Sequence, residues 1–239
     1  MLTLARLSGC RAMRPGLAYI VRGAPYLALT DQNPADMTLL ASRGPKFLMP
    51  PDSGFVPLGE APEPSPEELA AVVLDLYQDE AASSRGSMGE CDPGVTFAGL
   101  GDPLLRLDVL LDAVRLVAEA QNGVPFRLVT TGLVPSDVGD KLVASGLVAL
   151  GGADNRRETM IQTISVALPC HTEALFNELV QPRTTHGFSK VCGLISNLSE
   201  AGATVECTCV ARPDIDIAAT RKLALALGAA SFRERSFHI

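Results

Sequence analysis

The sequence predicts an α/β protein in which parallel strands are covered by helices, as an open sheet or as a partial barrel. Strand and helix signals alternate from residue 95 to residue 235, as they do in repeated strand–helix units. The 239 residues, 47% of them hydrophobic, suit one such domain, because α/β barrels commonly run to roughly 200–250 residues. Turn-forming and polar residues follow several apolar runs, which is where α/β proteins bind ligands.

The N-terminal stretch, residues 1–23, is expected to precede a single domain at residues 24–239. It contains four arginines and no acidic residue, with leucines between them. This composition is typical of an organellar transit peptide, but Pro15 and Gly16 interrupt a helix there. A transit peptide and an irregular start therefore both stay open.

The first expected strand is Ala24–Thr30, a short apolar run followed by turn-forming residues. Residues 36–64 then form a long segment rich in proline and glycine. Long loops in compact domains are usually functional, so we expect this one to cover a site. A helix is expected at 65–80, because Ser65 and Glu68 can form a capping box around Pro66.

The rest of the chain is expected to alternate regularly after a small, polar connection at 81–92. Apolar and β-branched runs predict a strand beginning at Val95 and further strands at 125–130, 146–150, 162–168, 204–211 and 230–235. Helical spacing predicts helices at 104–121, 136–145, 172–180, 187–201 and 215–227.

Charge and cysteine usage exclude some classes of function. The formal net charge is -7 without a basic stripe, which argues against nucleic acid as a partner. No apolar run approaches the roughly 20 residues that cross a bilayer, so we expect a soluble protein. The six cysteines include no Cys-x-x-Cys pair, and a reduced intracellular protein, cytoplasmic unless residues 1–23 direct it to an organelle, is the simplest interpretation.

The turn after Val95 carries the strongest functional signal. Gly99 and Gly101 let a ligand approach the backbone closely, and Asp102 offers a charged acceptor beside Pro103, which suits the first turn of a helix. Asp102 has a second interpretation as a helix N-terminal cap, worth about 1 kcal/mol whatever the function. Both interpretations stay open.

Over half of the chain resembles the radical S-adenosylmethionine (SAM) superfamily, in particular its TatD-associated branch. Residues 97–106 are similar to the branch's strand end of glycine, acid and proline followed by a leucine-arginine helix start. Residues 128–133 are similar to its threonine-asparagine-glycine turn, with Thr131 in place of asparagine. Residues 164–168 and 175–182 resemble its serine-bearing fourth strand and the following helix that ends in proline.

The resemblance implies a partial (β/α)6 TIM-like barrel that holds SAM across the strand ends. Gly101 and Asp102 would lie near the methionine amino group and Ser165 near the ribose, and Gly99 and Thr131 would be further cofactor-binding residues in the two turns. From its position after a strand, Arg212 could reach a carboxylate or phosphate in the barrel mouth.

The family's 4Fe–4S cluster is also implied, but its ligands are missing. The family carries Cys-x-x-x-Cys-x-x-Cys after the first strand, whereas this chain has no cysteine between Cys10 and Cys91. Iron–sulfur clusters depend on thiolate ligands. The resemblance thus implies SAM binding, whereas the missing thiolates argue against reductive cleavage of SAM.

Two other classes of function stay open. The barrel could be a non-catalytic structural or interaction subunit, a pseudoenzyme whose 36–64 loop is the contact surface. A metal-independent enzyme would need an acid–base pair, for which Asp102 and His171 are the candidates. Cys207 and Cys209 share one face of a strand near Cys170 and His171, but small buried hydrophobes are the favoured interpretation over a metal site.

Overall fold

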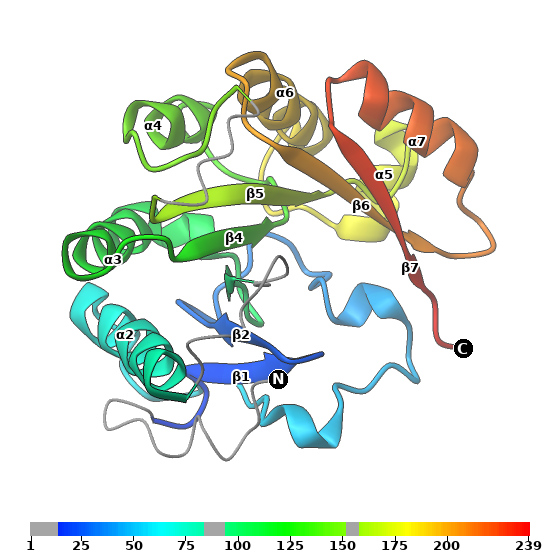
Figure 1. The fold of residues 1–239 in the computed structure, drawn as a ribbon. Helices are drawn as coiled ribbons and strands as arrows, with labels where there is room; N and C mark the ends of the chain where they lie inside the picture. The colour runs from blue at the N-terminus through cyan, green and yellow to red at the C-terminus, as the bar shows by residue number, and fades with distance from the viewer. Residues whose placement is uncertain (1–13, 84–93, 152–157) are drawn as a thin grey trace.

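The structure, a computed structural model, describes residues 14–83, 94–151 and 158–239. In this part of the chain, one seven-stranded sheet runs in chain order from β1 to β7. Its strands are β1 (Ala18–Val21), β2 (Ala24–Leu27), β3 (Val95–Phe97), β4 (Pro125–Thr130), β5 (Met160–Ala167), β6 (Val205–Ala211) and β7 (Ser231–Ser236). β1 and β2 are antiparallel, and the later neighbours are parallel. The sheet curls into a half-barrel, which confirms the predicted partial barrel (Figure 1).

Helices surround the outer side of this curved sheet (Figure 1). The α-helices are α2 (Pro66–Ser83), α3 (Leu107–Ala120), α4 (Val138–Ala144), α5 (Glu173–Val180), α6 (Gly187–Glu200) and α7 (Ile217–Ala226). Short 3₁₀ helices are η1 (Ala41–Arg43), η2 (Pro51–Ser53) and η3 (Pro103–Arg106). Among these described helices, none is long and apolar enough to cross a membrane.

The predicted capping box begins α2. The Ser65 amide donates to Glu68 Oε2 at 3.0 Å, and the Glu68 amide donates to Ser65 Oγ at 3.2 Å. Each side chain thus accepts from an amide that has no partner inside the helix. This reciprocal pair explains why the helix starts where the sequence predicted.

The hydrophobic core lies between the sheet and the outer helices. Along β4, fully buried residues alternate with half-buried ones, because successive side chains of a strand point to opposite faces. Phe126 belongs to the buried set and stacks on Phe97 of β3, with ring centroids 5.1 Å apart. Arg127 and Val129 take the other positions. The inner face of the half-barrel is therefore left for charged, hydroxyl and small apolar side chains.

The fold begins earlier than the sequence predicted. Residues 18–21, which we expected to precede the domain, form β1 and pair with β2, and Leu17 is fully buried. The expected boundary at residue 24 therefore falls inside the sheet. Residues 1–13, the first part of the stretch for which a transit peptide stayed open, lie outside the described residues.

One expected strand is absent from the described sheet. Residues 146–150 form only isolated bridges, from Val148 to Ile161 and from Leu150 to Ala203. Such single contacts do not extend into a ladder. The run is apolar because Val148 and Ala149 are buried, so burial rather than strand pairing explains its composition.

The 36–64 loop crosses the open side of the half-barrel, between the β1–β2 hairpin and β7 (Figure 1). Near its start, the Asp36 amide donates to the Gln181 carbonyl at 3.1 Å, and the Asp36 carboxylate pairs with Arg183 at 2.8 Å. Farther on, the Arg43 carbonyl accepts from the His238 amide at 2.8 Å. The loop is thus held against α5 and against the C-terminal segment.

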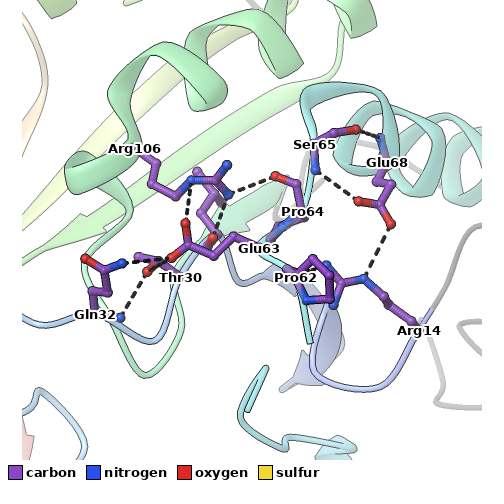
Figure 2. A network of polar contacts seen from close by, with 10 residues as sticks. Arg14, Thr30, Gln32, Pro62, Glu63, Pro64, Ser65, Glu68 and Arg106 are labelled. Atoms are coloured by element: carbon purple, nitrogen blue, oxygen red, sulfur yellow. Dashed lines mark hydrogen bonds and ion pairs between the residues drawn. The ribbon is translucent and has the colours of Figure 1, made fainter. Parts of the chain in front are cut away.

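The C-terminal end of this loop is fastened to the segment that follows β2 (Figure 2). The Arg106 guanidinium donates to the carbonyls of Leu29 and Pro64 at 2.9 and 2.8 Å, and it pairs with Glu63 at 3.1 Å. Glu63 in turn accepts from the Thr30 hydroxyl. Arg106 therefore joins the segment after β2 to the segment that leads into α2.

Candidate functional site

A cavity of about 200 Å³ lies on the inner side of the half-barrel, at the carboxyl ends of the parallel strands. The sheet and the residues that follow its strands contribute Tyr19, Tyr26, Ala98, Val129, Ala167 and Arg235 to its wall. The 36–64 loop contributes Met37, Leu39, Leu40, Arg43, Phe47 and Met49. The loop therefore covers a cavity, as its length and composition predicted.

Of the six residues that the sequence predicted to bind a cofactor, three line the cavity and three do not. Gly99, Thr131 and Arg212 line the cavity. The other three, Gly101, Asp102 and Ser165, are not among its lining residues.

Asp102 is buried, and its carboxylate is occupied by the chain's own donors. Oδ1 accepts from the Leu104 amide at 3.0 Å, as expected of a helix cap. Oδ2 accepts from the Thr131 amide at 2.8 Å and from the Thr131 hydroxyl, and the Thr130 hydroxyl contacts both oxygens. Burial raises the pKa of this carboxyl, although the hydrogen bonds oppose that shift. Asp102 thus joins the turn after β3 to the turn after β4.

Gly101 is required by the chain's own packing. A Cβ at this position would lie 2.3 Å from the Gln32 carbonyl oxygen and 2.6 Å from that of Thr30. The Gly101 amide donates to Thr30 O at 3.2 Å. The glycine therefore allows the turn to pack on the segment that follows β2. Gly99 is also packed by the chain, since a Cβ there would lie 2.9 Å from the Ala28 Cβ, but it lies on the cavity wall as well.

Ser165 lies deeper in the half-barrel, in a charged network that the sequence analysis did not find. Its hydroxyl donates to Glu206 at 2.8 Å, and Glu206 also pairs with Arg233 and, at 3.7 Å, with Arg127. Burial would raise the pKa of Glu206, but the hydrogen bonds from Arg233 and Ser165 and the charges of both arginines hold it below its ordinary value. Ser165 is therefore engaged by the chain's own charged groups.

Three arginines reach the cavity wall: Arg43, Arg212 and Arg235. Arg212 was predicted from its place after a strand, whereas Arg43 and Arg235 were missed. The signal for Arg235 was available, because Arg233 and Arg235 alternate along the last strand and so share one face. Nothing in the sequence of the 36–64 loop indicated that Arg43 would lie beside β7.

Three of the four cysteines in the described residues are buried as small hydrophobic residues are. Cys170, Cys207 and Cys209 are buried, and burial raises the pKa of both Cys207 and Cys209 to about 12. Within the described residues, no group of three or more His, Cys, Asp and Glu side chains could hold a metal ion.

The site does not fit a radical SAM cluster. The segment after β2, where the family carries its three cysteines, contains none in residues 30–40 and instead packs on Gly101 and on the α5–α6 connection. Cys10 and Cys91 lie outside the described residues. The predicted acid–base pair does not form at the cavity either, since neither Asp102 nor His171 lines it.

The fold is an α/β half-barrel that resembles the partial barrel of radical SAM enzymes. No family model matches the chain, and no curated protein matches it in sequence. Among solved structures, the crystal structure of Streptococcus suis SuiB bound to precursor peptide SuiA aligns with a TM-score of 0.56 at 12% identity, covering 89% of this chain and 39% of that one. The structure of TYW1 with a lysine-pyruvate adduct bound gives a TM-score of 0.48 at 12% identity, over 76% of this chain and 58% of that one.

The likeness to SuiB concerns the fold. The chain spans about 39% of the length of SuiB, so the activity of that longer protein is not transferred to it. The TatD-associated branch stays a prediction.

Proposed function

We propose that this chain binds a small organic ligand in the half-barrel cavity, with S-adenosylmethionine or a related adenosine compound as the ligand. The observation that carries this proposal is the position of the cavity, at the carboxyl ends of the strands and under a long loop. Ligand sites of α/β barrels lie at this end, and pockets with apolar walls and a few polar groups are typical of such sites.

The cavity wall offers a contact for several parts of such a ligand. Tyr19, Tyr26 and Phe47 provide aromatic rings for an adenine. Arg43 and Arg235 provide guanidinium groups for the methionine carboxylate. Asp102 does not serve the ammonium group, because its oxygens already accept from Leu104, Thr130 and Thr131.

Ligand binding is proposed without cluster-dependent chemistry. Three thiolates are needed to hold the family's cluster, and the segment after β2 supplies none. We assign no catalytic residue. Anaerobic reconstitution with iron and sulfide tests this point: the protein should gain no stoichiometric visible chromophore and no bound iron, and a stoichiometric cluster would contradict it.

Isothermal calorimetry with SAM tests ligand binding. Ala167→Phe places a ring in the cavity wall and should abolish the binding heat, whereas Ala226→Phe, on the exposed side of α7, should leave it unchanged. No heat with the wild-type protein would contradict the assignment of SAM. Equal heats for the wild type and Ala167→Phe would place the binding site elsewhere.

A non-catalytic interaction subunit is the second candidate. The observation that favours it is the exposure of large apolar side chains on the 36–64 loop: Leu48 is 82% exposed and Val56 is 45% exposed. Under this alternative, the protein binds neither SAM nor S-adenosylhomocysteine, and Leu48→Glu weakens association with its partner. Specific SAM binding that Ala167→Phe abolishes would count against it.

A further inference from the structure

The charged side chains of the cavity wall are all positive. Among the described residues that line it, Arg43, Arg212 and Arg235 carry charge and no acidic side chain is present. These arginines come from the 36–64 loop, from the end of β6 and from β7, so the fold brings them together from distant parts of the chain. An apolar wall with three guanidinium groups and no carboxylate favours an anion over a cation.

The three arginines differ in what already binds them. Arg212 is paired through two nitrogens with Asp214, at 3.0 and 2.8 Å. Arg43 donates from Nε to the Ser236 carbonyl at 3.0 Å and lies over the Phe47 ring. Both side chains are thereby held in place.

Arg235 differs from both. Within residues 14–83, 94–151 and 158–239, its guanidinium makes no hydrogen bond or ion pair, although it is partly buried. Glu206 attracts it through space but is itself bonded to Arg233 and Ser165.

Burial of these charges carries a cost that an anion would offset. Burial lowers the pKa of Arg235, and the neighbouring Arg233 and Arg43 lower it further. The pKa of Arg43 is lowered for the same reasons, by burial and by Arg22. Buried charges in proteins are ordinarily paired. A planar guanidinium pairs well with a carboxylate or phosphate, because it can donate two parallel hydrogen bonds.

The other residues of the cavity wall indicate what the rest of the ligand is like. Met37, Leu39, Phe47, Met49 and Phe176 are apolar. The volume of about 200 Å³ lies below the roughly 300–1,000 Å³ of pockets for drug-sized ligands. A compact ligand fits under the loop as it lies, whereas a ligand the size of SAM requires the loop to shift.

We propose that the cavity recognises an organic acid, a carboxylate or phosphate on a compact apolar or aromatic body, and that Arg235 with Arg43 pairs with the acid group. This inference rests on the proposed function, since it specifies what the same cavity binds. For SAM, the recognised group is its carboxylate. Its sulfonium finds no counter-charge on the described wall, so the uncharged thioether S-adenosylhomocysteine binds more tightly than SAM.

Two ring compounds of nearly the same shape test the inference. Benzoate and benzamide differ chiefly in charge, and ligand-detected NMR titration gives the dissociation constant of each for the full chain. Benzoate should bind at least about tenfold more tightly. In Arg235→Gln this difference should disappear, whereas Arg115→Gln, at an exposed position on α3, should preserve it. Phenyl phosphate, titrated in parallel, distinguishes a phosphate site from a carboxylate site.

Each outcome decides the question. Equal affinities for benzoate and benzamide, an unchanged difference in Arg235→Gln, or binding of neither compound would overturn the inference. If Arg235→Gln does not fold, the wild-type difference, checked by the rise in Tm that each compound causes, still decides it. Benzoate binding without SAM binding refutes the SAM assignment alone. SAM binding that neither benzoate nor Arg235→Gln affects refutes this inference alone.

Discussion

Asp102→Asn is the substitution for which the structure gives the sharpest expectation. Two backbone amides point at the carboxylate, one to each oxygen: that of Leu104 at 3.0 Å and that of Thr131 at 2.8 Å. Asparagine has nearly the same shape but a single acceptor oxygen. Whichever way its amide turns, one of the two buried amides faces an NH₂ group and loses its hydrogen bond.

The loss of folding stability follows from this one lost hydrogen bond. A hydrogen bond to a charged acceptor contributes about 1.5–3 kcal/mol, and a buried donor left without a partner costs about 1–3 kcal/mol. The two figures partly describe the same lost hydrogen bond, so their total is less than their sum. Asp102→Asn should therefore lower the free energy of unfolding by about 2–4 kcal/mol. That loss is a large fraction of the roughly 5–15 kcal/mol typical of a folded domain.

Urea denaturation followed by circular dichroism measures this loss. The matched control is Asp216→Asn. Asp216 caps α7 by accepting from the Ala219 amide at 2.9 Å, but it is exposed, and asparagine caps a helix about as well as aspartate. The control should change the free energy of unfolding by less than about 0.5 kcal/mol. If both variants lose the same amount, Asp102 is only a cap, and its role in joining two turns is refuted.

Three further predictions concern other parts of the fold. Gly101→Ala should lower the free energy of unfolding, measured by urea denaturation, by at least about 2 kcal/mol, because the new Cβ would meet the Gln32 carbonyl. Gly193→Ala, where a Cβ would lie in open space, should raise it by about 0.5–1 kcal/mol. Effects of the same sign would contradict this. Arg106→Ala should speed limited proteolysis of the 36–64 loop, because it removes the contacts to Leu29, Glu63 and Pro64. The exposed Arg115→Ala should not, and equal rates would show that Arg106 does not fasten the loop. The folded-state pKa of Glu206 is lowered, so its stabilisation is present above the unfolded-state pKa and is lost as pH falls through the folded-state value. Between about pH 6 and pH 3 the wild type should therefore lose about 1–2 kcal/mol more than Glu206→Gln, and parallel losses would refute the role of the network.

Much of the fold was predictable because its signals are local. The strand at Pro125–Thr130 and the helices α2, α5 and α6 lie within a few residues of their predicted bounds. Spacing of apolar residues and the Ser65–Glu68 capping box are enough to place them. The strand β1 was missed because it lies among arginines that resemble a targeting segment, and only its pairing with β2 shows that it belongs to the sheet.

The candidate site was predicted in part. Gly99, Thr131 and Arg212 were found because residues after parallel strands meet at one end of a barrel. The sequence also allowed two roles for Asp102, and the structure shows the helix cap. The sequence could not show that Thr130 and Thr131 would both donate to the Asp102 carboxylate. That arrangement depends on how two turns, separated by α3 and β4, approach each other.

By itself, the sequence determined most of the order of strands and helices, apart from β1 and the strand wrongly expected at 146–150. It also determined the absence of cluster cysteines after the first predicted strand and a long loop suited to cover a site. Periodicity, capping and ligand chemistry are properties of neighbouring residues, so they can be predicted without coordinates. Only the tertiary structure decided the charge of the cavity. Arg43, Arg212 and Arg235 are far apart in the chain, and the curl of the sheet with the loop across it brings them to one wall. Which charged side chains lie close together, and which of them have no carboxylate partner, depends on how the sheet curls and where the loop crosses it.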